Sequence, residues 1–155
     1  MQSLHPCLNT IAVLFDEESN SKTAALMQIA HYFHSCNPAL DEKDLFQRFW
    51  QREQMGATSI GHGVAIPHIR CTQIAGPASL LLRLAHPIDF NGVDRQPVDL
   101  LFGFIVPENE EEMHLHLLKE TCSILSHEEA REALRKAKNA NDIHRALRGS
   151  IPEVL

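Results

Sequence analysis

Residues 52–68, REQMGATSIGHGVAIPH, decide how the rest of this chain is interpreted. Three glycines fall within residues 55–63, which predicts a loop. The short apolar run 64–66 follows and Pro67 ends it, so we interpret that run as a strand. His68 is the next side chain. A histidine at a strand end beside a glycine-rich loop is expected at the surface with a fixed orientation, where functional residues often lie.

The chemistry of His68 suggests covalent catalysis. Imidazole has an unperturbed pKa of about 6.5, so it is a nucleophile near neutral pH. Attack on a phosphoryl group would give a phosphoimidazole, whose negative charge needs hydrogen-bond donors. Backbone N–H groups of glycine-rich turns and an arginine can supply them. Arg52, just before the loop, is the candidate arginine.

Upstream of this stretch, the pattern predicts one strand and two helices. The apolar run 11–15 is a candidate first strand. Ser21 is placed to cap a helix that Asn37-Pro38 would end. Asp41 is placed to cap a second helix, whose apolar stripe we assign to the core. That stripe consists of Leu45, Phe46, Phe49 and Trp50.

Downstream, two apolar segments, 79–85 and 98–106, predict buried strands. Helices are expected near residues 109–125, 126–138 and 141–149, the second opened by a capping box at Ser126. The charged side chains of 126–147 are expected to face solvent. Strands interleaved with helices indicate an α/β layer fold, and 155 residues suit a single domain, residues 1–155.

A second pair of histidines, His114 and His116, stands in the first turns of the predicted 109–125 helix. Residues two apart on a helix do not share a face, so at most one of them can point at His68. We expect His114 either to hydrogen-bond the phosphoryl oxygens or to orient His68.

Composition narrows the function classes. The formal charge of -6 argues against nonspecific nucleic-acid binding, which needs a basic surface. The longest apolar stretch, 100–106, is too short for membrane insertion, and no signal peptide is visible at the N-terminus. The four cysteines form no CxxC pair, and no nucleotide-binding GxxxxGK[ST] loop occurs. We therefore expect a reduced cytoplasmic protein without a cofactor.

Three segments in order, REQMGATSIGHGVAIPH, PIDFNGVDRQPVDLLFGFIVP and HLHLL, resemble the enzyme IIA domains of the phosphoenolpyruvate-dependent phosphotransferase system. The resemblance is to the fructose/mannitol class, most closely its nitrogen-regulatory branch, and covers residues 21–147. It implies a mixed β-sheet flanked by helices on both sides. It also implies His68 as the phosphorylated residue, with His114 and Arg52 as further active-site residues.

The resemblance implies protein partners as well. A histidine-containing phosphocarrier protein would donate the phosphoryl group. A sugar-branch domain would pass it to a IIB domain, whereas a nitrogen-branch protein would regulate targets such as potassium-transport machinery. His62 stands where the nitrogen branch usually has Asn, and Ile69-Arg70 where it usually has Gly-Lys. These departures concern docking, for which Ile69 and Met55 are candidate exposed apolar contacts, with a position in the core as an equal alternative for Met55.

Two rival interpretations remain open at this stage. Four histidines, His62, His68, His114 and His116, could converge on a metal ion, since zinc accepts imidazole readily. Alternatively, the fold could serve a regulatory binding module that acts on a partner in its unphosphorylated form. In that case phosphorylation of His68 would be the switch, because it adds nearly two negative charges.

Overall fold

The structure is a computed structural model that describes residues 5–92 and 94–149. Within these residues a six-stranded mixed sheet has the order β1-β5-β6-β3-β2, and β4 also pairs with β6. The strands are β1 (Ala12–Asp16), β2 (Ser59–Gly61), β3 (Val64–Ala65), β4 (His68–Cys71), β5 (Ala78–Ile88) and β6 (Val98–Pro107). The helices are α1 (Pro6–Asn9), α2 (Lys22–Cys36), α3 (Glu42–Gln54), α4 (Glu111–Leu125), α5 (Glu128–Lys136) and α6 (Ala140–Gly149).

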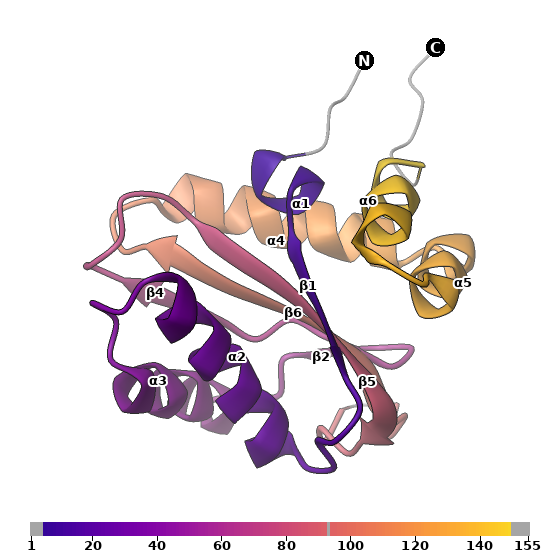
Figure 1. Cartoon of the computed structure of the whole chain (residues 1–155), viewed down its shortest axis with the longest axis horizontal. Helices are drawn as coiled ribbons and strands as arrows, with labels where there is room; N and C mark the ends of the chain where they lie inside the picture. Colours follow the sequence, from indigo (N-terminus) through magenta and orange to yellow (C-terminus); the bar gives the residue numbers. More distant parts are fainter. Residues whose placement is uncertain (1–4, 93, 150–155) are drawn as a thin grey trace.

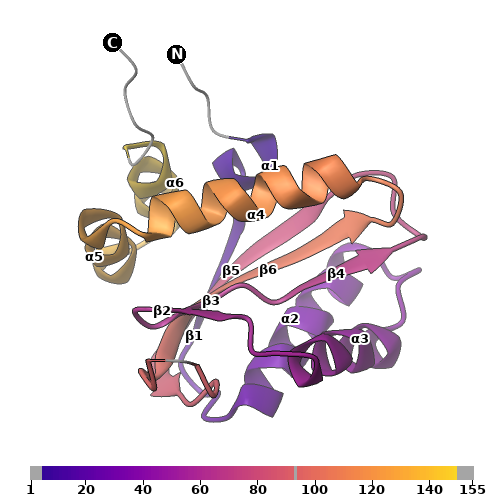
Figure 2. The same cartoon turned by 180° about the vertical axis from the view of Figure 1, so that it is seen from behind.

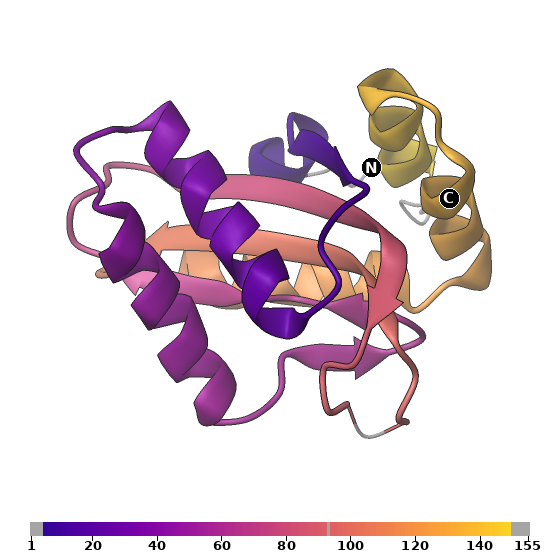
Figure 3. The same ribbon diagram turned by 60° about the horizontal axis from the view of Figure 1, so that its bottom comes forward.

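Helices cover both faces of the sheet, as the family resemblance implied. Helices α2 and α3 lie on one face, and α1, α4, α5 and α6 lie on the other (Figures 1, 2 and 3). Alternate residues of β6 supply the two cores, so that Phe102 and Phe104 pack with α4 to α6 while Leu101 and Ile105 pack with α2 and α3. None of the described helices is long and apolar enough to cross a bilayer.

The chain from β3 to β4 runs along one strand, β6, with an interruption between them. Val64 is paired in parallel with Leu100, and His68 with Phe104. Pro67 lies in the gap, where it has no N–H to donate but accepts a hydrogen bond from the Phe104 nitrogen at 3.0 Å. His68 is therefore the first residue of strand β4, whereas the sequence pattern had placed it just after the end of a strand.

Two strands were not foreseen. β2 lies inside the segment that the glycines predicted as loop, and β4 follows the proline that was expected to end the pattern. Both are short, three and four residues. Neither strand carries a long apolar or alternating run that would reveal it in the sequence. β2 is ordered by pairing with β3, and β4 by pairing with β6.

The predicted helix starts are confirmed in α2 and α3 and wrong in α5. Ser21 Oγ accepts from the Ala24 nitrogen at 3.1 Å, and an Asp41 oxygen accepts from Asp44 at 2.9 Å. The predicted capping box at Ser126 does not form. His127 is the residue before α5 and makes no side-chain cap, while the Ser126 hydroxyl donates to a carbonyl of α4.

The charged residues of α5 are not all solvated, which corrects a second expectation. Arg131 is buried and donates from Nη1 to Leu125 O at the end of α4, and Arg135 pairs with Asp99 of β6. Arg83 of β5 donates to three carbonyls in the last turn of α5 and just beyond it. The free carbonyls at helix ends need donors, and arginines supply them here.

Candidate functional site

His68 lies at one end of a groove of about 410 Å³ between the C-terminal turn of α3, strand β4 and the first turns of α4. Figure 2 shows β4 between α4, which covers one face of the sheet, and α3, which covers the other. The groove is lined by Arg48, Gln51, Arg52, Met55, His68, Ile69, Arg70 and His114. The structure thus brings the three residues singled out from the sequence, His68, His114 and Arg52, into one groove.

The imidazole of His68 is half-buried and held by its own backbone. Its Nδ1 lies 2.7 Å from the Ile66 carbonyl oxygen. A carbonyl can only accept a hydrogen bond, so Nδ1 carries the proton and Nε2 keeps its lone pair in the neutral ring. The break in the ladder at Pro67 allows this contact, because Ile66 O is free to accept from a side chain.

His114 of α4 packs against His68. The ring centroids are 5.0 Å apart and the planes meet at 86°, an edge-to-face arrangement. His114 is buried, and its Nδ1 has no hydrogen-bond partner among the described residues. His116 is exposed instead, with its Nε2 3.6 Å from a Glu120 carboxylate oxygen. The two histidines therefore lie on different faces of α4, and only His114 reaches the groove.

Arg52 occupies the last turn of α3 and donates from Nη1 to Gly56 O at 3.0 Å. Its neighbour Glu53 is buried and accepts hydrogen bonds from both the backbone nitrogen and the hydroxyl of Thr58. Glu53 also forms an ion pair with Lys22 at 2.7 Å. This network fixes the loop that follows Arg52. Glu53 was not singled out from the sequence, because its partners are a distant helix and a loop residue.

Two further arginines line the groove. Arg70 of β4 donates to Glu111 at 3.2 Å, and both side chains are largely exposed. Arg48 of α3 donates to the Arg70 carbonyl at 3.0 Å and pairs with Asp44. With Arg52 they make three guanidinium groups, and no carboxylate is among the lining residues. Such a set of donors suits an anion with several oxygens.

The surroundings favour the neutral form of both histidines. Burial lowers the pKa of His68, and the charge of Arg52 and the proximity of His114 lower it further, against the hydrogen bond to Ile66, which raises it. Burial is also the main cause of the lowered pKa of His114, followed by Arg70 and Arg52. At neutral pH the Nε2 of His68 therefore has a lone pair available for attack.

The two residues expected as exposed apolar contacts, Met55 and Ile69, differ in their exposure. Met55 is 83% exposed at the groove, which selects the exposed of its two predicted positions. Ile69 is buried in the core beneath α2 and α3, so its assignment as an exposed contact was wrong. It belongs to β4, where side chains alternate between the two faces, and His68 and Arg70 take the outward positions.

The four-histidine metal site does not form. His62 lies in the turn between β2 and β3, toward the opposite end of the sheet from His68, and His116 points away from both. Among the residues described, no group of three His, Cys, Asp or Glu side chains is placed to hold a metal ion. Only His68 and His114 of the four come together.

Comparison with known families gives a match over nearly the whole described chain. The family described as "Phosphoenolpyruvate-dependent sugar phosphotransferase system, EIIA 2" matches residues 7–149. A nitrogen regulatory protein from Pseudomonas aeruginosa is 37% identical over 134 residues, which are 86% of this chain and 87% of that protein. A fructose-specific EIIA component from Haloferax volcanii is 32% identical over 109 residues, 70% of this chain and 71% of that one.

Solved structures agree with the sequence comparison. The crystal structure of the nitrogen regulatory protein IIA-Ntr from Neisseria meningitidis superposes with a TM-score of 0.81 at 30% identity, over 90% of this chain and 94% of that one. The mannitol IIA of Escherichia coli gives a TM-score of 0.71 at 16% identity, over 87% of this chain and 94% of that one. The second likeness is one of fold alone.

Proposed function

This chain belongs to the EIIA 2 family of the phosphoenolpyruvate-dependent sugar phosphotransferase system, and from that premise we propose that His68 is the residue that carries the phosphoryl group. The donor in this proposal is the phosphohistidine of a histidine-containing phosphocarrier protein, and the exchange takes place in the cytoplasm. The observation that carries the proposal is the hydrogen bond from His68 Nδ1 to Ile66 O. It leaves Nε2 as the nucleophile of a ring whose orientation is fixed.

The transfer exchanges one nitrogen–phosphorus bond for another. The Nε2 lone pair of His68 attacks phosphorus in line, the bond to the donor imidazole breaks, and that imidazole leaves with the electron pair. His68 Nδ1 keeps its proton and its bond to Ile66 O throughout. One nitrogen–phosphorus bond forms as another breaks, so the transfer needs no external oxidant, metal or nucleotide. Catalysis rests on positioning and electrostatics.

Three groups in the groove are suited to the phosphoryl oxygens. Arg52 and Arg70 supply guanidinium donors, and His114 supplies an Nε2–H if its buried, unpartnered Nδ1 is the unprotonated nitrogen. Arg70 is paired with Glu111 in this structure through an exposed contact, and such contacts are weak. A phosphoryl group carrying nearly two negative charges on His68 would compete well for that guanidinium.

We further propose that the phosphorylation state of His68 regulates partner proteins. The identity of 37% to a protein named for nitrogen regulation favours this role over sugar transport. The second candidate function is transfer to a IIB domain of a sugar transporter, which the 32% identity to a fructose-specific EIIA component supports. The two roles share the phosphohistidine and differ in what contacts it next.

The direct test is incubation with labelled phosphoenolpyruvate, enzyme I and the phosphocarrier protein. We expect stoichiometric label on the wild-type chain and none on His68→Ala. His62→Ala is the matched control, since it removes an exposed imidazole that lies away from the groove, and it should take up label like the wild type. Equal labelling of His68→Ala would refute the assignment.

The regulatory role has its own test, which does not depend on the rate of transfer. Partners captured with the unphosphorylated chain are compared for His68→Ala, which cannot be phosphorylated, and His68→Asp, which places a negative charge at the same position. We expect the two variants to differ in partner affinity. Identical binding by both would show that the charge on this residue is not the switch.

A further inference from the structure

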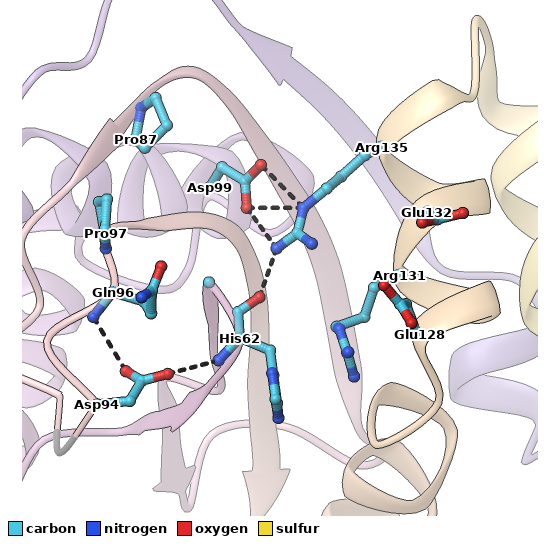
Figure 4. Close-up of a pocket in the computed structure, with 11 residues that line it drawn as sticks. His62, Pro87, Asp94, Gln96, Pro97, Asp99, Glu128, Arg131, Glu132 and Arg135 are labelled. Atoms are coloured by element: carbon cyan, nitrogen blue, oxygen red, sulfur yellow. Dashed lines mark hydrogen bonds and ion pairs between the residues drawn. The ribbon is translucent and has the colours of Figure 1, made fainter.

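A second cleft, of about 520 Å³, lies between α5, the turn that joins β2 to β3, and the segment leading into β6. Figure 4 shows the residues that line it. Asp99 at this end of β6 is five residues before Phe104, the residue paired with His68. At about 3.3 Å per strand residue the two positions are roughly 17 Å apart along the strand. The cleft is therefore separate from the groove of His68.

One wall of the cleft is a closed network. Arg135 binds both carboxylate oxygens of Asp99 at 2.9–3.1 Å and donates to His62 O at 2.6 Å. Asp94 accepts from the backbone nitrogens of His62 and Gln96. The turn approaches so closely that a Cβ on Gly63 would lie 2.5 Å from Arg135 Nη2. These two carboxylates are thus already occupied.

Helix α5 supplies a second arginine to the cleft, Arg131, and this one has unused donors. Arg131 is only 8% exposed, and its Nη1 donates to Leu125 O at 2.8 Å. Its Nε and Nη2 have no partner in the described part of the chain, and no carboxylate oxygen there lies within 4 Å. These unused donors line the cleft, and the planar fork of a guanidinium fits a carboxylate. Figure 4 shows the Arg131 and His62 side chains extending in the same direction.

The rim of the cleft has the opposite charge. Glu128 and Glu132 of α5 are exposed lining residues and form no ion pair with any described residue. An anion with two charges would be repelled by them and by the chain's net charge of -6, whereas an ammonium group would be attracted. We propose that this cleft binds a small zwitterion, with its carboxylate on Arg131 and its ammonium group at Glu128 and Glu132.

The test uses three matched probes on the full chain, followed by the backbone amides in ¹⁵N-labelled protein. γ-Aminobutyrate carries both charges, butyrate only the carboxylate and butylamine only the ammonium. We expect saturable shifts of the Gln96 and Arg135 amides with γ-aminobutyrate in the millimolar range. Butyrate should bind up to about fivefold more weakly, the contribution of one exposed ion pair, and butylamine should cause no saturable shift.

Variants assign the two charges separately. Arg131→Gln should abolish the shifts with γ-aminobutyrate, while Glu132→Gln should weaken its binding toward that of butyrate. Arg148→Gln, at an exposed position of α6, is the control and should bind like the wild type. The proposal is overturned if no probe shifts these amides, or if Arg131→Gln, folded by its own spectrum, still binds. Labelling of His68 is independent of every one of these results.

Discussion

The two ends of the sheet hold the same residue types and use them differently. Each end has a histidine, arginines and a glycine-containing segment, and each is hollowed. At the His62 end, Arg135 is bound to a carboxylate and a backbone carbonyl, and its task is to hold α5 to the sheet. At the His68 end, Arg52 touches only a backbone oxygen, and no carboxylate lines the groove.

The histidines differ in the same way. His68 is half-buried, its Nδ1 is hydrogen-bonded to Ile66 O, and its ring meets that of His114 edge to face. These contacts fix the direction of the remaining nitrogen, Nε2. The imidazole of His62 is exposed, although the backbone of this residue is fixed through Asp94 and Arg135. For the phosphoryl transfer that we propose at His68, the difference matters because the transfer needs an oriented nitrogen beside a cation without a carboxylate partner, here Arg52, and residue type alone does not provide that arrangement.

Among the changes that test this contrast between the two ends, the largest effect is expected at Arg52. Replacement by Gln removes a guanidinium aimed at the proposed phosphoryl oxygens, so the initial rate of labelling should fall by about 10²–10³-fold. The free energy of unfolding should change by less than about 0.5 kcal/mol, since the side chain makes a single exposed contact with Gly56. A rate within a few-fold of the wild type would remove Arg52 from the site.

Arg135→Gln should give the reverse pattern. This change breaks the two-oxygen contact with Asp99 and the bond to His62 O, all partly exposed, so the free energy of unfolding should drop by about 1–2 kcal/mol. The labelling rate of the folded fraction should stay near that of the wild type. Urea titration followed by the labelling assay measures both quantities on one sample. Loss of labelling without loss of stability would contradict the division between the two ends.

The pH dependence of labelling tests the environment of His68. Its pKa is lowered by burial and then by Arg52 and His114, so the neutral nucleophile should persist below the ordinary value of 6.5. The rate should hold steady as the pH falls to 6.5 and decline only below it. Arg52→Gln should move that decline to higher pH. A rate that already halves at or above 6.5 in the wild type would contradict the assigned surroundings.

The same lowered pKa also predicts how stability depends on pH. The unfolded chain binds a proton at His68 more readily than the folded chain does. The stability that the neutral ring contributes is therefore complete above 6.5 and is lost as the pH falls toward the folded-state pKa. His68→Gln should show a shallower fall of melting temperature over this window.

Much of the fold could be predicted because its main signals are local. The runs in β5 and β6 are long and apolar, and the caps Ser21 and Asp41 act within three residues. The resemblance to the enzyme IIA family, given by three ordered segments, is confirmed by the family match. β2 was not predicted because its three residues lie in a glycine-rich segment, and β4 because its partner β6 is distant in sequence. The capping box at Ser126 was wrong because the Ser126 hydroxyl bonds back into α4 instead.

The site could be predicted in its main residues and less well in its surroundings. His68, His114 and Arg52 do lie in one groove. Arg70 enters it through the alternation of β4, and recognition of that strand would also have placed Ile69 in the core. The burial of Arg131 could not be anticipated, because three glutamates lie within three residues of it and only the packing of α5 encloses it.

The smallest effect should come from Glu111, whose carboxylate holds Arg70 at 3.2 Å. Glu111→Gln releases the guanidinium toward His68, so labelling should rise by about two- to threefold, within the range of an exposed ion pair. Glu112→Gln is the matched control, because it removes the same charge from the first turn of α4 without touching Arg70. The gain should vanish when Arg70 is also replaced by Gln. An equal gain with Glu112→Gln would instead assign the effect to the general field of the helix end, and would leave the Arg70–Glu111 pair with no part in the phosphoryl groove.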